Sequence, residues 1–178
     1  MRKIIVIGTV HGGFTPNNEL QDVLENFKPG QLLVEIAEED IKKDNLKEYP
    51  SEMICAYNWA KKRKIPVNGF DSTINVLAEG ITEEHNKKAI KIQLKRIERY
   101  TWKDLNKEEY LKMVDSELLP PPLNQLIDEK KMKQREKEMV KNIKKYIHKK
   151  GDIIIITGAG NLKIFEKEFP NAIFPYRK

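Results

Sequence analysis

The sequence has one cysteine, Cys55, and no long apolar run. A single cysteine cannot form a disulfide bond within the chain, which favours a reducing compartment. The apolar runs are short, whereas a helix that spans a bilayer needs about 20 apolar residues. The first run, residues 4–7, is also too short for the core of a secretory signal. We therefore expect a cytoplasmic chain with no membrane partner.

Several motifs of well-understood enzymes are also missing. The sequence contains no H-E-x-x-H zinc motif, no P-loop, no C-x-x-C pair and no G-x-S-x-G nucleophile turn. The run Gly158-Ala159-Gly160 begins like the dinucleotide-binding pattern G-x-G-x-x-G, but Lys163 stands at the position of the third glycine. The run also follows the last long strand, whereas the dinucleotide pattern follows the first. We therefore expect no nicotinamide cofactor.

The chain carries a net charge of +6, and the basic excess lies in residues 81–151. The lysines of this region are interleaved with glutamates, and no glycine-rich or aromatic-rich binding module accompanies them. This pattern favours a solvated helical face over a nucleic-acid surface, so we expect no nucleic-acid partner. The abundance of Lys, Glu and Ile also suggests a thermophilic source with surface ion pairs.

Alternating apolar strands and amphipathic helices predict an α/β fold with a mostly parallel central sheet flanked by helices. Apolar runs without a polar face are typical of strands that are buried on both sides. Helices with one apolar face fall between these runs, and such strand–helix–strand units form right-handed crossovers. The expected helices of the first half begin near Pro16 and Ser51. The expected strands are residues 3–7, 32–36, 65–70 and 152–157, with 172–174 as a candidate last strand.

Residues 82–150, between the third and fourth strands, are expected to form a helical insertion within a single domain that covers residues 1–178. Three prolines at 120–122 separate a first helical part from a long helix predicted over residues 123–149. Two apolar stripes at helical spacing support the first part: Ile90, Leu94 and Ile97, and then Leu111, Val114 and Leu118.

Two polar residues stand near the ends of the first two strands. His11 follows the first strand, and Glu35 interrupts the apolar run of the second. Ligands of open parallel sheets bind at the carboxyl ends of the strands. If these strands are neighbours, about 4.8 Å apart, His11 and Glu35 can meet directly or through one water or ion.

Each of these residues has a structural explanation beside the functional one. His11 could cap a backbone group in its own turn, or it could transfer protons, because histidine titrates near neutral pH. Glu35 could mark the point where the strand reaches solvent. Alternatively it is buried as a general base or a metal ligand, because an ionised carboxylate inside a strand needs a partner.

Arg135 lies on the apolar stripe of the predicted long helix. Its aliphatic stem could pack against the core while the guanidinium reaches solvent. Alternatively the guanidinium reaches the site, where it would pair with Glu35 or hold an anionic group of a substrate. The other members of the stripe are Met132, Met139, Ile143 and Tyr146.

Turns that contain glycine at two strand ends are the expected substrate-binding segments. Glycine lets the backbone approach a ligand closely, and backbone amides at the start of a helix can bind an anion or an oxyanion. Asn161 can hydrogen-bond a substrate through its amide. The expected substrate-binding residues are Gly8, Thr9 and Gly12 after the first strand, and Gly158, Gly160 and Asn161 after the fourth.

Taken in order, these motifs resemble those of the TraB/PrgY family, within a superfamily that includes ChaN-like proteins and erythromycin esterases. The resemblance covers nearly the whole chain. It implies that His11 and Glu35 are the catalytic pair and that Arg135 supports them. The last motif of the family usually reads Gly-x-Gly-His, whereas Asn161 stands here at the fourth position and cannot shuttle protons. The matching runs are Gly8-Thr9-Val10-His11, Leu32-Leu33-Val34-Glu35, Asp71, Arg135-Glu136-Lys137-Glu138-Met139 and Ile155-Ile156-Thr157-Gly158-Ala159-Gly160-Asn161.

The resemblance leaves the cofactor open, because relatives include a proposed metal-dependent peptidase and metal-independent esterases. A metal ion would be held by His11, Glu35 and Asp71. One nitrogen ligand among oxygen donors favours a loosely bound Mn²⁺ or Mg²⁺ over a structural Zn²⁺. The alternative is a site that works without a metal.

Two functions are compatible with these residues. The first is a hydrolase of a peptide or ester bond, in which His11 and Glu35 activate a water molecule and Arg135 orients Glu35 or the developing oxyanion. The second is a non-catalytic domain that binds or sequesters a peptide or small molecule, which Asn161 favours. In both, the partner is a peptide or a small molecule.

Overall fold

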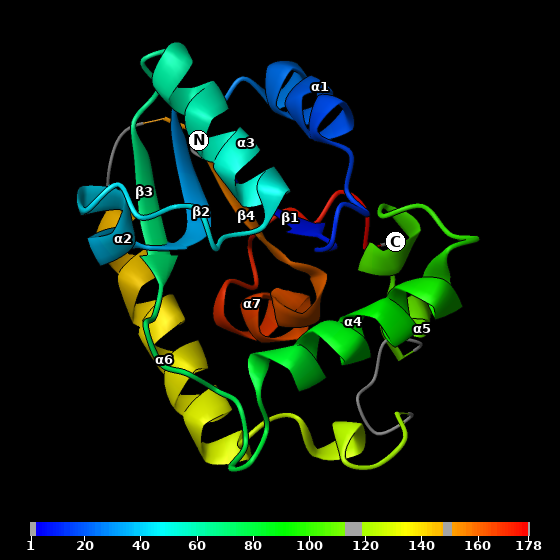
Figure 1. Ribbon diagram of the computed structural model, residues 1–178. Coiled ribbons are helices and arrows are strands. Elements are labelled where there is room, and N and C mark those ends of the chain that lie inside the picture. The colour runs from blue at the N-terminus through cyan, green and yellow to red at the C-terminus, as the bar shows by residue number, and fades with distance from the viewer. Residues whose placement is uncertain (1–2, 113–118, 148–150, 178) are drawn as a thin grey trace.

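The computed structural model describes residues 3–112, 119–147 and 151–177. Its centre is a four-stranded, entirely parallel sheet in the order β1-β4-β2-β3 (Figure 1). The predicted α/β fold with a parallel sheet is confirmed. The strands are β1 (Ile4–Thr9), β2 (Gln31–Ala37), β3 (Val67–Asp71) and β4 (Ile153–Gly158).

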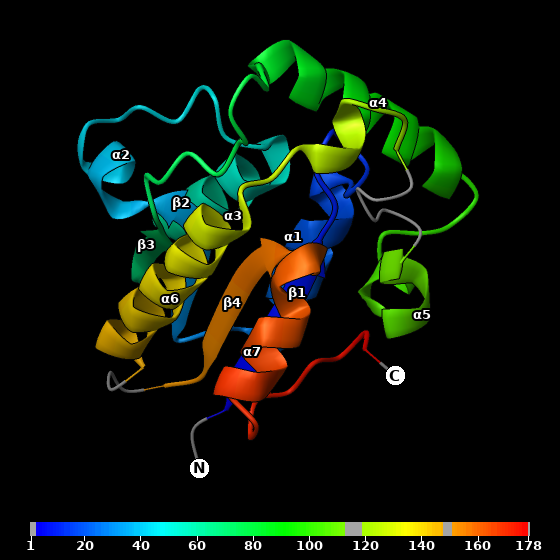
Figure 2. The same cartoon turned by 90° about the horizontal axis from the view of Figure 1, so that it is seen from below.

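Helices cover both faces of this sheet, as the apolar runs of the strands require. α1 (Asn17–Phe27) and α3 (Ser51–Lys62) pack on one face, where Leu20, Leu24 and Met53 are fully buried. α6 (Glu129–Tyr146) and α7 (Leu162–Glu168) pack on the other (Figure 2). A short helix, α2 (Glu38–Lys42), follows β2 directly.

The strand order separates the two strands whose ends carry His11 and Glu35. β4 lies between β1 and β2 and pairs with both of them. The two strands are therefore not neighbours, and the condition under which His11 and Glu35 would meet across one strand spacing does not hold. Any link between them passes over the carboxyl end of β4.

The helices of residues 82–150 divide into two groups. α6 belongs to the sheet, because Met139, Val140 and Ile143 are part of the core on its face of the sheet. α4 (Glu83–Ile97) lies apart from the helices that cover the sheet (Figures 1 and 2). It shares a small separate core whose buried residues are Ala89, Leu119, Leu123 and Leu126. The short helices of this region are η1 (Asp104–Asn106), α5 (Glu108–Leu111) and η4 (Leu123–Gln125).

Two sequence expectations about this region change. The long helix begins at Glu129 and not at residue 123, because the side chain of Asp128 accepts hydrogen bonds from the backbone amides of Lys130 and Lys131 and so caps it. The predicted stripe of Leu111, Val114 and Leu118 falls mostly outside the described residues. Val114 and Leu118 are not among them, and neither is the side chain of Leu111.

The candidate last strand, residues 172–174, is reduced to a single bridge. Ile173 pairs with Ile5 in parallel fashion, beside β1. Its amide donates to Ile4 O at 2.8 Å, and its carbonyl accepts from Val6 N at 2.8 Å. Within the part of the chain that the structure describes, no helix combines the length and the apolar character that crossing a membrane requires.

Candidate functional site

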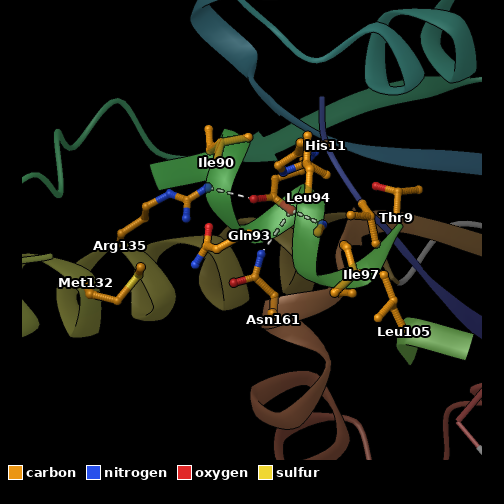
Figure 3. Close-up of a pocket in the computed structure, with 15 residues that line it drawn as sticks. Thr9, His11, Ile90, Gln93, Leu94, Ile97, Leu105, Met132, Arg135 and Asn161 are labelled. Carbon is orange, nitrogen blue, oxygen red and sulfur yellow. Dashed lines mark hydrogen bonds and ion pairs between the residues drawn. The ribbon is translucent and has the colours of Figure 1, made fainter. Parts of the chain in front are cut away.

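A pocket of about 390 Å³ lies where the carboxyl end of the sheet meets α4. Its polar lining includes His11, Glu35, Arg135 and Asn161, which come from four separate segments of the chain (Figure 3). Thr9, Gly158 and Gly160 also line it, whereas Gly8, Gly12 and Asp71 do not. The opposite wall is mostly apolar and is formed by Ile90, Leu94, Ile97, Leu105 and Met132, with the polar side chain of Gln93 among them.

Glu35 sits at an irregularity of β2. Val34 pairs with Gly69 of β3, but the next pair is Ala37 with Asp71, so β2 has one extra residue here. Such a β-bulge ends regular pairing and can redirect a side chain. Gly69 makes the bulge sterically possible, because a Cβ atom at this position would lie 2.3 Å from Ile36 O. Pairing of β2 with β4 also ends at Val34, which leaves Glu35 free to reach the end of β4.

The carboxylate of Glu35 accepts four hydrogen bonds. Its Oε2 accepts from Thr157 Oγ1 at 2.6 Å, from the Gly158 amide at 2.6 Å and from Asn161 Nδ2 at 3.0 Å. Its Oε1 accepts from Arg135 Nη2 at 2.7 Å. Glu35 is only 7% exposed, so these donors replace the water that an ionised carboxylate would otherwise bind.

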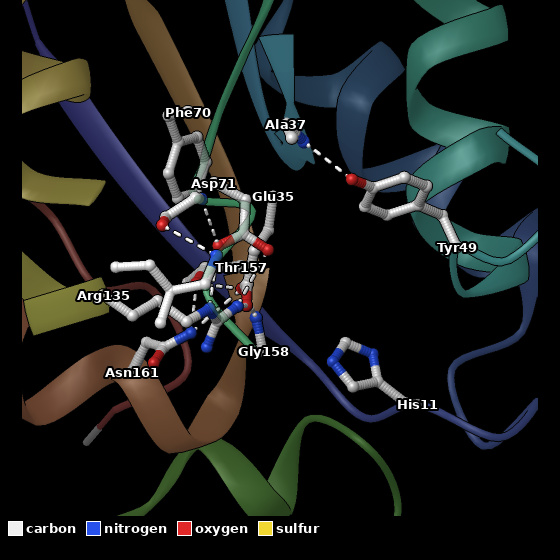
Figure 4. A network of polar contacts seen from close by, with 12 residues as sticks. His11, Glu35, Ala37, Tyr49, Phe70, Asp71, Arg135, Thr157, Gly158 and Asn161 are labelled. Atoms are coloured by element: carbon white, nitrogen blue, oxygen red, sulfur yellow. Dashed lines mark hydrogen bonds and ion pairs between the residues drawn. The ribbon is translucent and has the colours of Figure 1, made fainter. Parts of the chain in front are cut away.

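Arg135 joins Glu35 to a second carboxylate. Its Nε donates to Asp71 Oδ1 and its Nη2 to Asp71 Oδ2, both at 2.9 Å, in a two-pronged ion pair. The third nitrogen, Nη1, makes no hydrogen bond with any residue that the structure describes. We call the residues Glu35, Asp71, Arg135, Thr157 and Asn161 the Glu35 cluster (Figure 4).

The pKa values within the Glu35 cluster follow from burial and charge. Burial raises the pKa of Glu35, but the charges of Arg135 and His11 and the bonds from Thr157 and Gly158 outweigh it, so the pKa is lowered. Burial raises the pKa of Asp71 despite its bonds to Arg135, and the charge of Glu35 adds to this. The pKa of Arg135 is raised because its two carboxylates outweigh its burial. Glu35 is therefore an anion whose two oxygens both accept hydrogen bonds, and its lowered pKa makes it a weak base.

His11 has a different partner, which the sequence analysis missed. Its Nδ1 lies 2.6 Å from Oε1 of Glu52, in the first turn of α3. Glu52 is 0% exposed, and its Oε2 has no hydrogen-bond partner among the described residues. The His11 side chain is 41% exposed. A buried carboxylate thus holds one nitrogen of a ring that is partly open to solvent.

The pKa of His11 is raised above its ordinary value. Burial lowers it, but the hydrogen bond to Glu52 and the charges of Glu35 and Glu52 favour the imidazolium more strongly, while Arg135 opposes them. When the ring is neutral, Nδ1–H donates to Glu52, and Nε2 is left as an acceptor. A Cβ atom on Gly158 would lie 3.2 Å from this Nε2 and 3.7 Å from Glu35 Oε2. Gly158 therefore lies between His11 and the Glu35 cluster (Figure 4).

The predicted metal ligands do not form a ligand set. Glu35 and Asp71 both direct carboxylate oxygens at Arg135, so a guanidinium occupies the space between them. Across residues 3–112, 119–147 and 151–177, no three His, Cys, Asp or Glu side chains are grouped to hold a metal ion. The residues present do not fit a Mn²⁺ or Mg²⁺ ion bound by His11, Glu35 and Asp71.

Two of the predicted substrate-binding glycines serve packing instead. Gly8 is covered by the buried side chain of Asn106, whose Oδ1 accepts from the Gly8 amide at 3.0 Å and whose Nδ2 donates to the Gly8 carbonyl at 2.9 Å. Gly12, with φ of +76°, lies under α4, where a Cβ atom would come within 2.7 Å of Leu94. Asn106, also missed in the sequence, ties the segment after α4 to the end of β1.

No family model, no curated protein and no solved structure matches this chain. The resemblance to the TraB/PrgY family therefore stays a prediction. The pocket combines a partly exposed histidine on a buried glutamate, two carboxylates whose oxygens all accept hydrogen bonds, and a mostly apolar wall.

Proposed function

We propose that this protein hydrolyses an ester or amide bond, with His11 as the general base that activates a water molecule. The observation that carries the proposal is the contact of His11 Nδ1 with the fully buried Glu52 at 2.6 Å. A carboxylate at Nδ1 holds the ring in the tautomer whose Nε2 can accept a proton, and it stabilises the imidazolium that results. Both effects are what a general base needs.

The residues of the pocket suggest a simple sequence of steps. Nε2 of His11 takes a proton from a water molecule as the water oxygen attacks the carbonyl carbon of the substrate. The carbonyl oxygen becomes an oxyanion while His11 becomes an imidazolium, whose charge offsets the new negative charge, and Nη1 of Arg135 is the hydrogen-bond donor available to the oxyanion. When the bond to the leaving group breaks, the imidazolium returns the proton to the leaving oxygen or nitrogen, which restores the neutral ring.

In this proposal Glu35 is a positioning residue and not the base. Its four hydrogen bonds fix Arg135, Asn161 and the Gly158 amide relative to one another. Its negative charge also favours the imidazolium form of His11. The pairing of His11 with Glu35 that the sequence suggests is thus replaced by His11 with Glu52, while Glu35 and Arg135 support the pair from the other side of Gly158.

The experiment is a screen of chromogenic esters and anilides with the wild type, His11→Gln and His85→Gln. His85 is the matched control, because it lies partly exposed at the start of α4, outside the pocket lining, and caps that helix through Thr82. Loss of the base should lower kcat by about 10²–10⁴-fold, and His85→Gln should leave kcat unchanged. Equal activity in wild type and His11→Gln would rule out the proposed base.

A second candidate function is a pocket that binds a small molecule without turnover. Asn161 supports it, because both of the hydrogen bonds that its amide nitrogen donates stay within the Glu35 cluster, to Glu35 and Thr157. No proton transfer can occur through an amide side chain. A wild type that binds ligands in this pocket but hydrolyses none of the screened esters or anilides would favour this function.

A further inference from the structure

The charges beneath the pocket are unbalanced. Three carboxylates, those of Glu35, Asp71 and Glu52, accompany one fixed cation, Arg135. With His11 neutral the balance is negative by two charges, and protonation of either His11 or Asp71 still leaves it negative. The guanidinium is already shared between two carboxylates, so it has little attraction left for an anion of a ligand.

Arg135 nevertheless keeps one donor for the ligand. Its Nε and Nη2 are used by Asp71 and Glu35, while Nη1 has no partner among the described residues. Such a donor can bind a neutral acceptor, for example a carbonyl oxygen. The alternative raised by the sequence, in which Arg135 holds an anionic group of the substrate, is disfavoured by the same geometry, because that group would meet the carboxylates of Glu35 and Asp71.

The α4 side of the pocket offers apolar side chains that can cover a hydrocarbon group of a ligand. Ile90, Leu94 and Ile97 project from successive turns of α4, and Leu105 and Met132 close the wall from two other segments (Figure 3). Gln93 of α4 adds a polar side chain to this wall. The apolar side chains gain free energy when they cover an apolar surface. The volume of about 390 Å³ is near the lower end of the range for small-molecule sites, about 300–1,000 Å³.

We infer that the ligand of this pocket is a small uncharged molecule, in which an apolar group against α4 is joined to an ester or amide carbonyl beside His11 and Arg135. This inference rests on the proposed function for the reaction, but the class of ligand can be tested without turnover. Molecules that carry a carboxylate or phosphate next to the carbonyl are excluded by the charges beneath the pocket.

The test compares octanamide with octanoate at pH 8, by NMR titration of the isotope-labelled protein, and the signals of octanamide itself confirm that it is not hydrolysed during the titration. The two probes share a chain, and only octanoate is charged at its head. Octanamide should bind with a Kd at least tenfold lower than that of octanoate. Its binding should change the chemical shifts of Leu94 and Gly160. Octanoate binding as tightly as octanamide, or shifts elsewhere only, would overturn the inference.

Variants on α4 locate the apolar group. Leu94→Asp should weaken octanamide at least tenfold, whereas Lys95→Asp, which changes an exposed neighbour, should not. Equal weakening by both variants, or by neither, would overturn the placement against α4. If Leu94→Asp does not fold, the comparison of octanamide with octanoate on the wild-type protein still tests the class of ligand.

The two proposals fail separately. Selective octanamide binding without hydrolysis of any ester supports the ligand class and contradicts the hydrolase. Hydrolysis that depends on His11, together with octanoate inhibiting as well as octanamide, supports the hydrolase and contradicts the ligand class.

Discussion

The two sides of Gly158 differ in how completely their polar groups are satisfied. In the Glu35 cluster, every carboxylate oxygen accepts at least one hydrogen bond, and Arg135 donates to both carboxylates. In the His11–Glu52 pair, one oxygen of a fully buried carboxylate has no partner among the described residues, and the ring is partly open to solvent. Both sides contain a glutamate in the core, yet only in the His11–Glu52 pair does a carboxylate oxygen lack a hydrogen-bond partner among the described residues.

This difference suggests that the two groups of residues have different roles. A network in which every carboxylate oxygen accepts a hydrogen bond resists a change in charge or geometry, because adding a proton to a carboxylate would break one of these bonds. A histidine held at one nitrogen only can gain and lose a proton at the other without disturbing its partner. The Glu35 cluster therefore suits positioning, and the His11–Glu52 pair suits proton transfer.

The largest effect is expected from breaking the Glu35 cluster at Arg135. Arg135→Met keeps most of the stem but leaves Glu35 and Asp71 buried without their cation, which should cost about 3–5 kcal/mol of unfolding free energy. Lys133→Met on the same helix is the control, because Lys133 is exposed and its ion pair with Glu129 lies on the surface. Urea unfolding measures the stability of both variants. Equal free energies of unfolding for Arg135→Met and Lys133→Met would contradict the structural role of the cluster.

A smaller loss is expected from crowding the bulge that carries Glu35. Gly69→Ala would place a Cβ atom 2.3 Å from Ile36 O, and relief of such a contact should cost about 1–3 kcal/mol. Gly160→Ala is the control, since a Cβ atom there meets nothing within 4 Å. Thermal unfolding that affects both glycines alike would show that the bulge is not constrained as described.

The smallest effect should appear on the other side of Gly158, as a dependence of stability on pH. The pKa of His11 is raised in the folded state, so its protonation stabilises the fold below the unfolded pKa of about 6.5. That contribution is lost as the pH rises through the folded value. The stability advantage of wild type over His11→Gln should therefore shrink from pH 5 to pH 9, and an advantage that grows over this range would contradict the charge environment assigned to His11.

Much of this arrangement follows from the sequence, because two simple rules apply. Apolar runs locate the four strands, and the carboxyl ends of parallel strands share one edge of the sheet, which places His11, Glu35 and Asn161 near one another. Arg135 stood out because a guanidinium on an apolar stripe needs either a partner or a path to solvent. The structure puts all four in the lining of one pocket.

Other features leave little trace in a single sequence. Strand order is one, since nothing in the four apolar runs indicates that β4 lies between β1 and β2. Glu52 is another, because an acidic residue in the first turn of a helix is common for its favourable interaction with the helix dipole.

The most direct test of the central claim is the pH dependence of kcat/KM for an uncharged ester, in wild type, Glu52→Gln and Glu35→Gln. If His11 is the base and Glu52 its partner, wild-type activity rises with pH through a pKa above the ordinary histidine value. Glu52→Gln should lower that apparent pKa and reduce kcat by about 10²-fold or more. Glu35→Gln should also lower the pKa, by less, because only its charge acts on His11. An unchanged profile in Glu52→Gln, with activity lost only in Glu35→Gln, would contradict the account and return the role of base to Glu35.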